Sequence, residues 1–251
     1  MDALFQAQLL GEFRFFVRGC LLDIPAQRQR GLLAVLLADC PRAVSARRLA
    51  EYLWDGSRPS NERAALHIHM TRLRRLLVRA DCRLGSAIRT GQGSYRIDCD
   101  GLSTDLAAYQ TATRVAMEAR HSGDLAAERR HLEQALALWR GELLEDVPLA
   151  GAYDEKRLQL RDGHLWVMER VNEVRIAMGD SLLAVPELRR LAMADPLRES
   201  TWYLLMRALL EAGRSAEAVA AFHTARDVFV SELGVEPGVR LRELFHELLA
   251  A

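Results

Sequence analysis

Hydrophobic positions alternate with polar ones near the start of the chain. In GEFRFFVRG, the side chains of Phe13, Phe15 and Val17 fall on one face of an extended segment. A turn at Arg18-Gly19 leads into CLLDIP. The alternation and the turn together predict two short strands.

Helical spacing replaces this alternation after Pro25. In RQRGLLAVLLAD, four leucines lie three or four positions apart or adjacent, and Pro41 ends the segment: they are Leu32, Leu33, Leu36 and Leu37. In the next segment, SARRLAEYLWDG, Ser45 is a good N-cap and Gly56 a good helix end. Its apolar face comprises Leu49, Leu53 and Trp54. We predict two short helices here.

A longer third helix is predicted over 61–79, with Ser60 as its N-cap. At about 100° per residue, one stripe of this helix is apolar: Leu66, Met70, Leu73 and Leu77. SAIRTGQGSYRID then shows two strand-like runs around a glycine-rich turn, which predicts a hairpin. Strands, three helices and a hairpin, in this order, predict a winged helix-turn-helix over 1–102.

From residue 103 to residue 251 strand signals disappear, and alanine, leucine and charged residues dominate. Helices are predicted at 104–121, 124–139, 153–178, 181–194, 198–212, 215–232 and 238–250. Gly179 and Gly213 lie 34 residues apart, the period of a tetratricopeptide repeat. We expect a mainly α chain whose second domain stacks antiparallel helix pairs, with GELLEDVPLAGAY as an interrupting loop. A plain helical bundle is the alternative.

Charge is distributed unevenly although the net charge is zero. Residues 1–100 carry 16 arginines against 10 acidic residues, whereas residues 101–251 carry 18 basic and 24 acidic residues. This asymmetry indicates an anionic partner for the first domain, unless it is ordinary fluctuation. The sequence shows no membrane-spanning run and no signal peptide, so a cytoplasmic protein is expected. The four scattered cysteines are expected to be free thiols.

The face of the third helix opposite its apolar stripe fits the major groove of DNA. It comprises Ala64, Ile68, Thr71, Arg72, Arg75 and Arg79. Ala64 allows close approach, and a thymine methyl group would shelter Ile68. Arg72 can fork onto a guanine edge or onto a phosphate, while Arg75 and Arg79 are expected to meet phosphates. A solvated arginine face is the alternative for this helix alone.

Other candidate contacts lie beside this face. His67 is placed on the flank of the helix, where it can reach the DNA backbone, and His69 at the edge of the core. These histidines point about 200° apart, so they cannot share a metal ion. In the hairpin, Arg89 or Arg96 could reach an adjacent minor groove or its phosphates.

Enzyme signatures are missing from the sequence. It contains no Walker motif, no GxSxG, no HExxH, no zinc-ligand spacing and no activated Cys/His arrangement. We therefore expect a protein that is not an enzyme and that has no metal or cofactor.

Several motifs together resemble the Streptomyces antibiotic regulatory protein family: HMTRLRRLL, GSYRI, ALALWRGELLEDVP and ELGVEPG, in this order along almost the whole chain. The resemblance implies an OmpR-type winged helix at 1–102 and a tetratricopeptide-like bacterial transcriptional activation domain at 103–251. It implies activation of secondary-metabolite genes by binding promoter direct repeats as side-by-side copies and recruiting RNA polymerase, sigma factor included. The TRLRR run implies DNA-facing roles for Arg72, Arg74 and Arg75, and helical periodicity places Arg74 on the flank.

Two functions therefore remain open at the sequence level. The first is a promoter-specific transcription activator. The second is a helical-repeat adaptor whose basic N-terminal domain binds an acidic protein partner. Salt-dependent binding to duplex DNA distinguishes the two.

Overall fold

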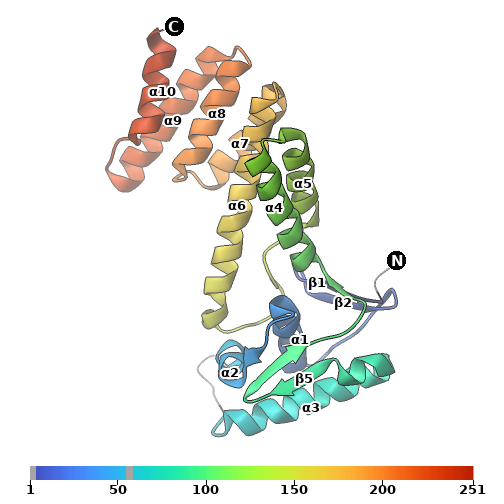
Figure 1. Ribbon diagram of the computed structural model, residues 1–251. Coiled ribbons are helices and arrows are strands. Elements are labelled where there is room, and N and C mark those ends of the chain that lie inside the picture. The colour runs from blue at the N-terminus through green and yellow to red at the C-terminus, as the bar shows by residue number, and fades with distance from the viewer. Residues whose placement is uncertain (1–3, 55–58, 251) are drawn as a thin grey trace. The chain divides into compact units, whose positions relative to one another are not determined.

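A computed structural model describes residues 4–54 and 59–250 of the chain. The chain divides into two compact units, and Figure 1 labels most of their helices and some of their strands. The N-terminal unit comprises residues 1–112 and 134–163, and the C-terminal unit comprises residues 113–133 and 164–251. The predicted fold class is confirmed, since a winged helix-turn-helix with small sheets is followed by helices alone.

Short strands of the N-terminal unit form two small sheets. They are β1 (Phe5–Gln8), β2 (Arg14–Val17), β3 (Cys20–Leu21), β4 (Val44–Ser45), β5 (Ile88–Gly91), β6 (Ser94–Ile97) and β7 (Leu102–Thr104). One sheet has the order β3-β2-β1-β7, in which β1 is antiparallel to β2 and parallel to β7. The other has the order β4-β6-β5 and contains the predicted hairpin. The sequence analysis predicted β2, β3, β5 and β6 but not β1, β4 or β7.

Three helices form the core of the N-terminal unit: α1 (Gln27–Asp39), α2 (Ala46–Leu53) and α3 (Glu62–Ala80). The four leucines predicted to face the core in α1 are at most 1% exposed. The hydroxyl of Ser45 accepts a hydrogen bond from the Arg48 amide at 3.2 Å, which confirms the predicted N-cap of α2. This helix ends at Leu53, and the predicted end at Gly56 lies outside the described residues. A 3-10 helix, η1 (Cys82–Ser86), follows α3.

The N-terminal unit is completed by a segment from much later in the chain. We call residues 139–153 the return segment; it includes the 3-10 helix η2 (Gly151–Tyr153). The sequence analysis predicted a loop here, and its side chains are buried: Leu143, Leu144, Val147 and Tyr153 are at most 2% exposed. The Leu144 amide donates to the Leu9 carbonyl at 2.8 Å. This segment therefore packs against the first sheet as part of its core.

Asp105 joins the first strands to this later segment. It is the first residue of α4 (Asp105–Ser122), and its carboxylate accepts hydrogen bonds from the amides of Leu9 (2.8 and 3.0 Å) and Leu10 (3.1 Å). The same carboxylate forms an ion pair with Arg140. Thr104 caps α4, because its hydroxyl accepts a hydrogen bond from the Ala107 amide at 3.0 Å.

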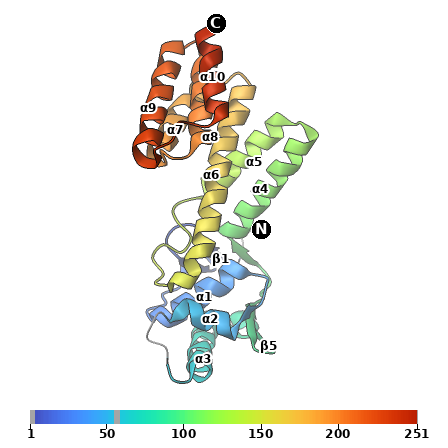
Figure 2. The same cartoon turned by 90° about the vertical axis from the view of Figure 1, so that its left-hand side faces the viewer.

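The remaining helices lie close to their predicted positions. They are α5 (Leu125–Leu138), α6 (Asp154–Ala177), α7 (Ser181–Ala194), α8 (Glu199–Glu211), α9 (Ser215–Leu233) and α10 (Val239–Ala250). Gly123, Gly179 and Gly213 end three helices with φ angles of 75°, 83° and 72°. Residues other than glycine rarely adopt such positive φ angles. Successive helices α7, α8 and α9 pack on one another, and α10 packs on α8 and α9 (Figure 2).

Buried ion pairs connect helices of the C-terminal unit. Glu128, 1% exposed, accepts two hydrogen bonds from Arg170 at 2.6 and 2.9 Å. Glu169 accepts from Arg198 at 2.9 Å and from the Thr201 hydroxyl at 2.6 Å. Their partners satisfy these charges, so burial is tolerated.

Two further sequence-based expectations concern the chain as a whole. All four cysteines are free thiols, as predicted. None of the helices in residues 4–54 and 59–250 combines the length and the apolar composition that a bilayer span requires.

Candidate nucleic-acid interface

Helix α3 has one buried stripe and one exposed face, as its sequence predicted. The four residues of the stripe are at most 1% exposed: Leu66, Met70, Leu73 and Leu77. The helix is capped by Asn61, whose side-chain oxygen accepts the Ala64 amide at 2.9 Å. The predicted cap, Ser60, is therefore wrong by one position. The error has a simple reason, since both residue types cap well and only the backbone shows where the helix begins.

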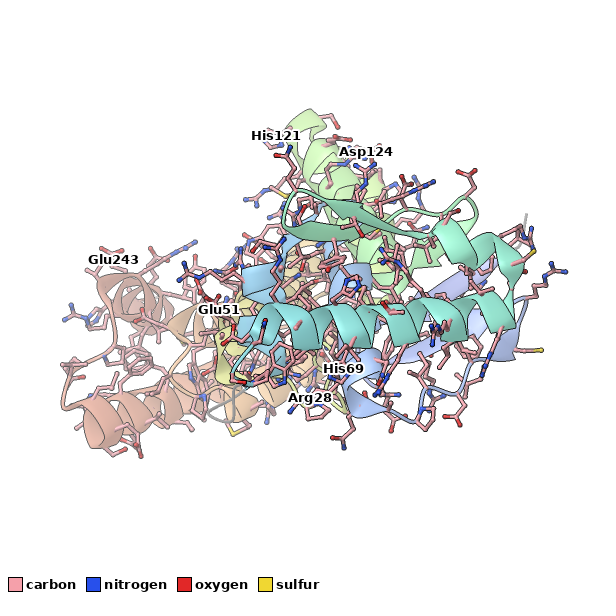
Figure 3. The ribbon with its side chains drawn as sticks, turned by 90° about the horizontal axis from the view of Figure 1, so that it is seen from below. Arg28, Glu51, His69, His121, Asp124 and Glu243 are labelled. Atoms are coloured by element: carbon pink, nitrogen blue, oxygen red, sulfur yellow. The ribbon has the colours of Figure 1, made fainter. Side chains whose placement is uncertain are left out.

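Most of the predicted contact residues of α3 are exposed. They are Ala64, His67, Ile68, Arg72, Arg75 and Arg79, whereas Thr71 is half-buried. Ile68 is 51% exposed. Figure 3 shows α3 in full length with its side chains. Among these predicted contacts, the first half of the helix presents Ala64, His67 and Ile68, and the second half presents the three arginines.

Arg74 occupies a different position from its neighbours. Its guanidinium donates to the Ile88 carbonyl at 2.9 Å and to the Thr90 hydroxyl at 2.7 Å. Both acceptors belong to β5, so Arg74 fixes the hairpin against α3. The hydrogen bonds to the wing explain why the Arg74 side chain lies where it does. Its predicted contact with DNA stays a prediction.

The wing presents a second pair of cations. Arg89 and Arg96 are directly opposite each other across β5 and β6, and both are exposed. Like charges at such positions repel, and an anion between them would relieve the repulsion. Asp98 lies 3.6 Å from Arg96 and offsets part of this charge. Tyr95, on the opposite face of the hairpin, is buried.

Several other arginines of the N-terminal unit are already paired with acids. Arg18 and Arg83 both donate to the buried carboxylate of Asp81, at 2.9 and 3.0 Å, and these bonds hold the pKa of Asp81 well below its usual range. Arg30 is paired with Asp146. By contrast, Arg72, Arg75 and Arg79 have no ion-pair partner among the described residues. The three arginines of α3 and Arg89 of the wing are therefore among the exposed cations of this unit that remain available to an anionic partner.

The two histidines of α3 differ in their surroundings. His67 is exposed, while His69 is half-buried with its ring 6.3 Å from that of Trp54. Burial, followed by the charges of Arg72 and Arg28, lowers the pKa of His69. Figure 3 shows His69 next to Arg28 from the start of α1. His69 therefore lies at the edge of the core, as the sequence analysis expected.

Sequence reasoning missed two arginines near this surface. Arg63 is exposed in the first turn of α3, although periodicity places it close to the apolar stripe. The reason is that no residue before Leu66 in this helix is buried. Arg28 comes from α1, and its position beside α3 depends on packing that no local pattern shows.

Comparisons with known proteins identify the family. Residues 104–249 match the bacterial transcriptional activator domain. The regulatory protein DnrI of Streptomyces peucetius is 30% identical over 254 residues, which cover 98% of this chain and 92% of DnrI. The chain belongs to the Streptomyces antibiotic regulatory protein family.

Other members of this family extend the comparison. The regulatory protein AfsR of Streptomyces coelicolor is 36% identical over 247 residues, and the chain spans 24% of the length of AfsR. The transcriptional regulatory protein MoaR1 of Mycobacterium tuberculosis is 30% identical over 245 residues, which cover 79% of MoaR1. The structure is similar to that of M. tuberculosis EmbR, solved in complex with a low affinity phosphopeptide. The TM-score is 0.90 at 27% identity, over 98% of this chain and 65% of the EmbR chain.

The structure gives physical reasons for two of the family motifs. In LWRGELLEDVP, the Trp139 ring lies 5.5 Å from that of Tyr109, and Arg140 pairs with Asp105. A Cβ atom on Gly141 would lie 3.1 Å from the Cα atom of Gly11, so a side chain would push the two segments apart. This motif therefore holds the return segment against the first strands.

The second motif, ELGVEPG, ends one helix and positions the next. Gly234 ends α9 with a φ angle of 69°. Glu236 accepts hydrogen bonds from Arg226 at 2.7 and 2.5 Å. The Gly238 amide donates to Glu199 at 2.9 Å, and a Cβ atom there would lie 2.6 Å from the carboxylate. Gly234, Glu236 and Gly238 thus contribute to the connection between α9 and α10.

Proposed function

We propose that this chain is a sequence-specific DNA-binding transcription activator that inserts α3 into the major groove. The single observation that carries the proposal is the exposed cationic half of α3, opposite a fully buried stripe. Arg72, Arg75 and Arg79 point away from the core without acidic partners among the described residues. The family membership supports the same function, since its named relatives are regulatory proteins.

Each part of this surface has a separate task in the proposed complex. Arg72 forks onto a guanine edge, and Ile68 packs against a thymine methyl group, so these two residues read sequence. Arg75 and Arg79 bind phosphates and set the register of the helix. The Arg89–Arg96 pair of the wing binds the adjacent minor groove or its phosphates. Arg74 contributes to DNA binding by fixing the position of the wing through its hydrogen bond to β5.

The proposed partners follow from this arrangement and from the family. Copies of the chain bind side by side to direct repeats in promoters of a secondary-metabolite gene cluster. The activation domain, whose residues 101–251 carry six more acidic than basic residues, contacts RNA polymerase with its sigma factor rather than DNA. The protein acts in the cytoplasm, at the nucleoid, and needs neither a cofactor nor a metal.

A salt titration of duplex DNA binding tests the proposal. Fluorescence anisotropy with the full chain should give a log K that falls linearly with log salt, with a slope of about −0.9 per phosphate neutralised. Arg75→Gln should reduce the magnitude of this slope by about 0.9, because one phosphate contact is lost. Arg130→Gln is the matched control, because Arg130 is an exposed arginine of α5 in the C-terminal unit. Absence of DNA binding at low salt would instead favour the adaptor that binds an acidic protein.

A further inference from the structure

A groove lies between the start of α1 and the second half of α3, wholly within the N-terminal unit. We call it the α1–α3 groove. Its apolar lining includes Leu22, Pro25, Leu76 and Ala80, and its volume is about 490 Å³. This volume is in the range of small-molecule sites. The groove is therefore large enough for an aromatic or aliphatic ligand.

A buried polar group in this groove has unused hydrogen-bonding capacity. Gln29 of α1 lines the groove and is 6% exposed. Its side-chain amide has no hydrogen-bond partner among residues 4–54 and 59–250. The polar atoms of this amide are not enclosed by protein and lie open to the groove, where a ligand group that donates or accepts a hydrogen bond can meet them.

Positive charge surrounds the same groove. Arg72, Arg75 and Arg79 line it from α3. Ala26 lines it at the N-terminus of α1, where no side chain caps the first amides and no acid lies in the first turn. The helix dipole therefore adds to the charge of the three arginines. Among the groove residues named, none is acidic.

We propose that the α1–α3 groove binds a small amphipathic anion. Its apolar ring or chain lies on Leu22, Pro25 and Leu76, a hydrogen-bonding group meets the Gln29 amide, and its acidic group meets the arginines. A bare phosphate would use the arginines but leave the apolar lining and Gln29 unmatched. A neutral apolar molecule would leave the arginines unmatched.

Such a ligand would compete with DNA for α3. Arg72, Arg75 and Arg79 belong both to the groove and to the proposed DNA-binding face. A small anion bound in the groove therefore neutralises the arginines that would otherwise bind DNA. Binding of the small anion stands on the groove alone, whereas the competition rests on the proposed function. The groove thus gives the protein a means of release from DNA by a small molecule.

The fluorescent probe 8-anilinonaphthalene-1-sulfonate has the required chemistry: fused rings, an N–H donor and a sulfonate. Titration of the full chain should show saturable binding at one site above a weak background. Ala26→Trp should remove this component, because Ala26 is exposed and extended at the mouth of the groove, where an indole fits without disturbing the core. The double variant Arg75→Gln/Arg79→Gln should weaken it about tenfold. Arg130→Gln should leave it unchanged.

Competition experiments complete the test. The probe should weaken binding of duplex DNA by the wild-type chain but not by Ala26→Trp, which keeps all three arginines. Unchanged probe affinity in Ala26→Trp would overturn the proposal, as would displacement of the probe by inorganic sulfate at constant ionic strength. A probe that fills the groove without weakening DNA binding would overturn the competition. A wild-type chain that binds the probe but no DNA would refute the proposed function and leave the site intact.

Discussion

Adjacent arginines of α3 have different partners because each residue advances the helix by about 100°. Arg74 turns toward β5 and donates to Ile88 and Thr90, whereas Arg75 is exposed. Sequence periodicity predicted which side of the helix Arg74 and Arg75 occupy, although it misplaced Arg63. It could not predict the acceptors of Arg74, since these lie on a hairpin 14 to 16 residues later. The side of the helix on which an arginine lies was predictable from the sequence, whereas its hydrogen-bond partners were not.

Replacement of Arg72 and Arg79 should separate base reading from phosphate binding. Arg72→Ala should weaken specific binding by about 1–3 kcal/mol, with the loss concentrated at one base pair, because a bidentate contact to one base is removed. Arg79→Ala should weaken all sequences equally, because phosphates are the same everywhere. Binding to a library of randomised sites measures both. A uniform loss in both variants would show that Arg72 contacts only the backbone.

His164 makes the stability of the C-terminal unit depend on pH. Burial, together with the charge of Arg190, lowers the pKa of this histidine to about 4. The unfolded chain therefore binds more protons than the folded one between pH 4 and about 6.5, so stability falls as pH decreases through this window, by up to about 3 kcal/mol. Urea unfolding at several pH values measures the slope. His164→Leu should flatten it, and an unchanged slope in this variant would assign the effect to other groups.

At the scale of elements, long helices were predicted well and short strands poorly. The seven helices from α4 to α10 begin and end within one residue of their predicted bounds, because amphipathic periodicity and glycine ends are local signals. β1, β4 and β7 have only two to four residues, and they pair with strands far away in the sequence. β7 is a strand because it pairs with β1. The three residues LST contain no periodicity from which this pairing could be predicted.

Asp105 should be critical for the first sheet and the return segment together. Asp105→Ala should lower the free energy of unfolding of the N-terminal unit by about 3 kcal/mol, because two buried amides and Arg140 lose their acceptor. Urea denaturation followed by circular dichroism measures the change. Glu12→Ala, which removes an exposed partner of Arg14, is the matched control and should cost little. Equal stabilities of the two variants would contradict this role for Asp105.

At the scale of the whole molecule, packing and sequence divide the chain differently. The activator-domain match begins at residue 104, whereas residues 134–163 belong to the N-terminal compact unit. The composition of the sequence changes near residue 102, and a composition shift does not show which later segment returns to an earlier core. The division of function between 1–102 and 103–251 stays a prediction.

Side-by-side binding makes a prediction about promoter spacing. Direct repeats about one helical turn apart place two copies on the same face of the DNA. Insertion of about five base pairs between the repeats should rotate one copy to the opposite face and weaken paired occupancy and transcription. Insertion of about ten base pairs should return both copies to the same face of the DNA and restore part of the transcriptional activity. Footprinting and a reporter gene measure the two, and insensitivity to the half-turn insertion would exclude neighbouring copies in contact.

The parallel pairing of β1 with β7 has a consequence for synthesis on the ribosome. β1 is translated first, yet one of its edges stays unpaired until β7 emerges, and Leu9 and Leu10 stay uncovered until the return segment follows. At about 5–20 residues per second, this delay is on the order of ten seconds. An open strand edge during that interval invites pairing with other chains. Nascent chains stalled before residue 139 should therefore be cleaved readily by protease within β1 and β2, and chains stalled well beyond residue 163 should resist it.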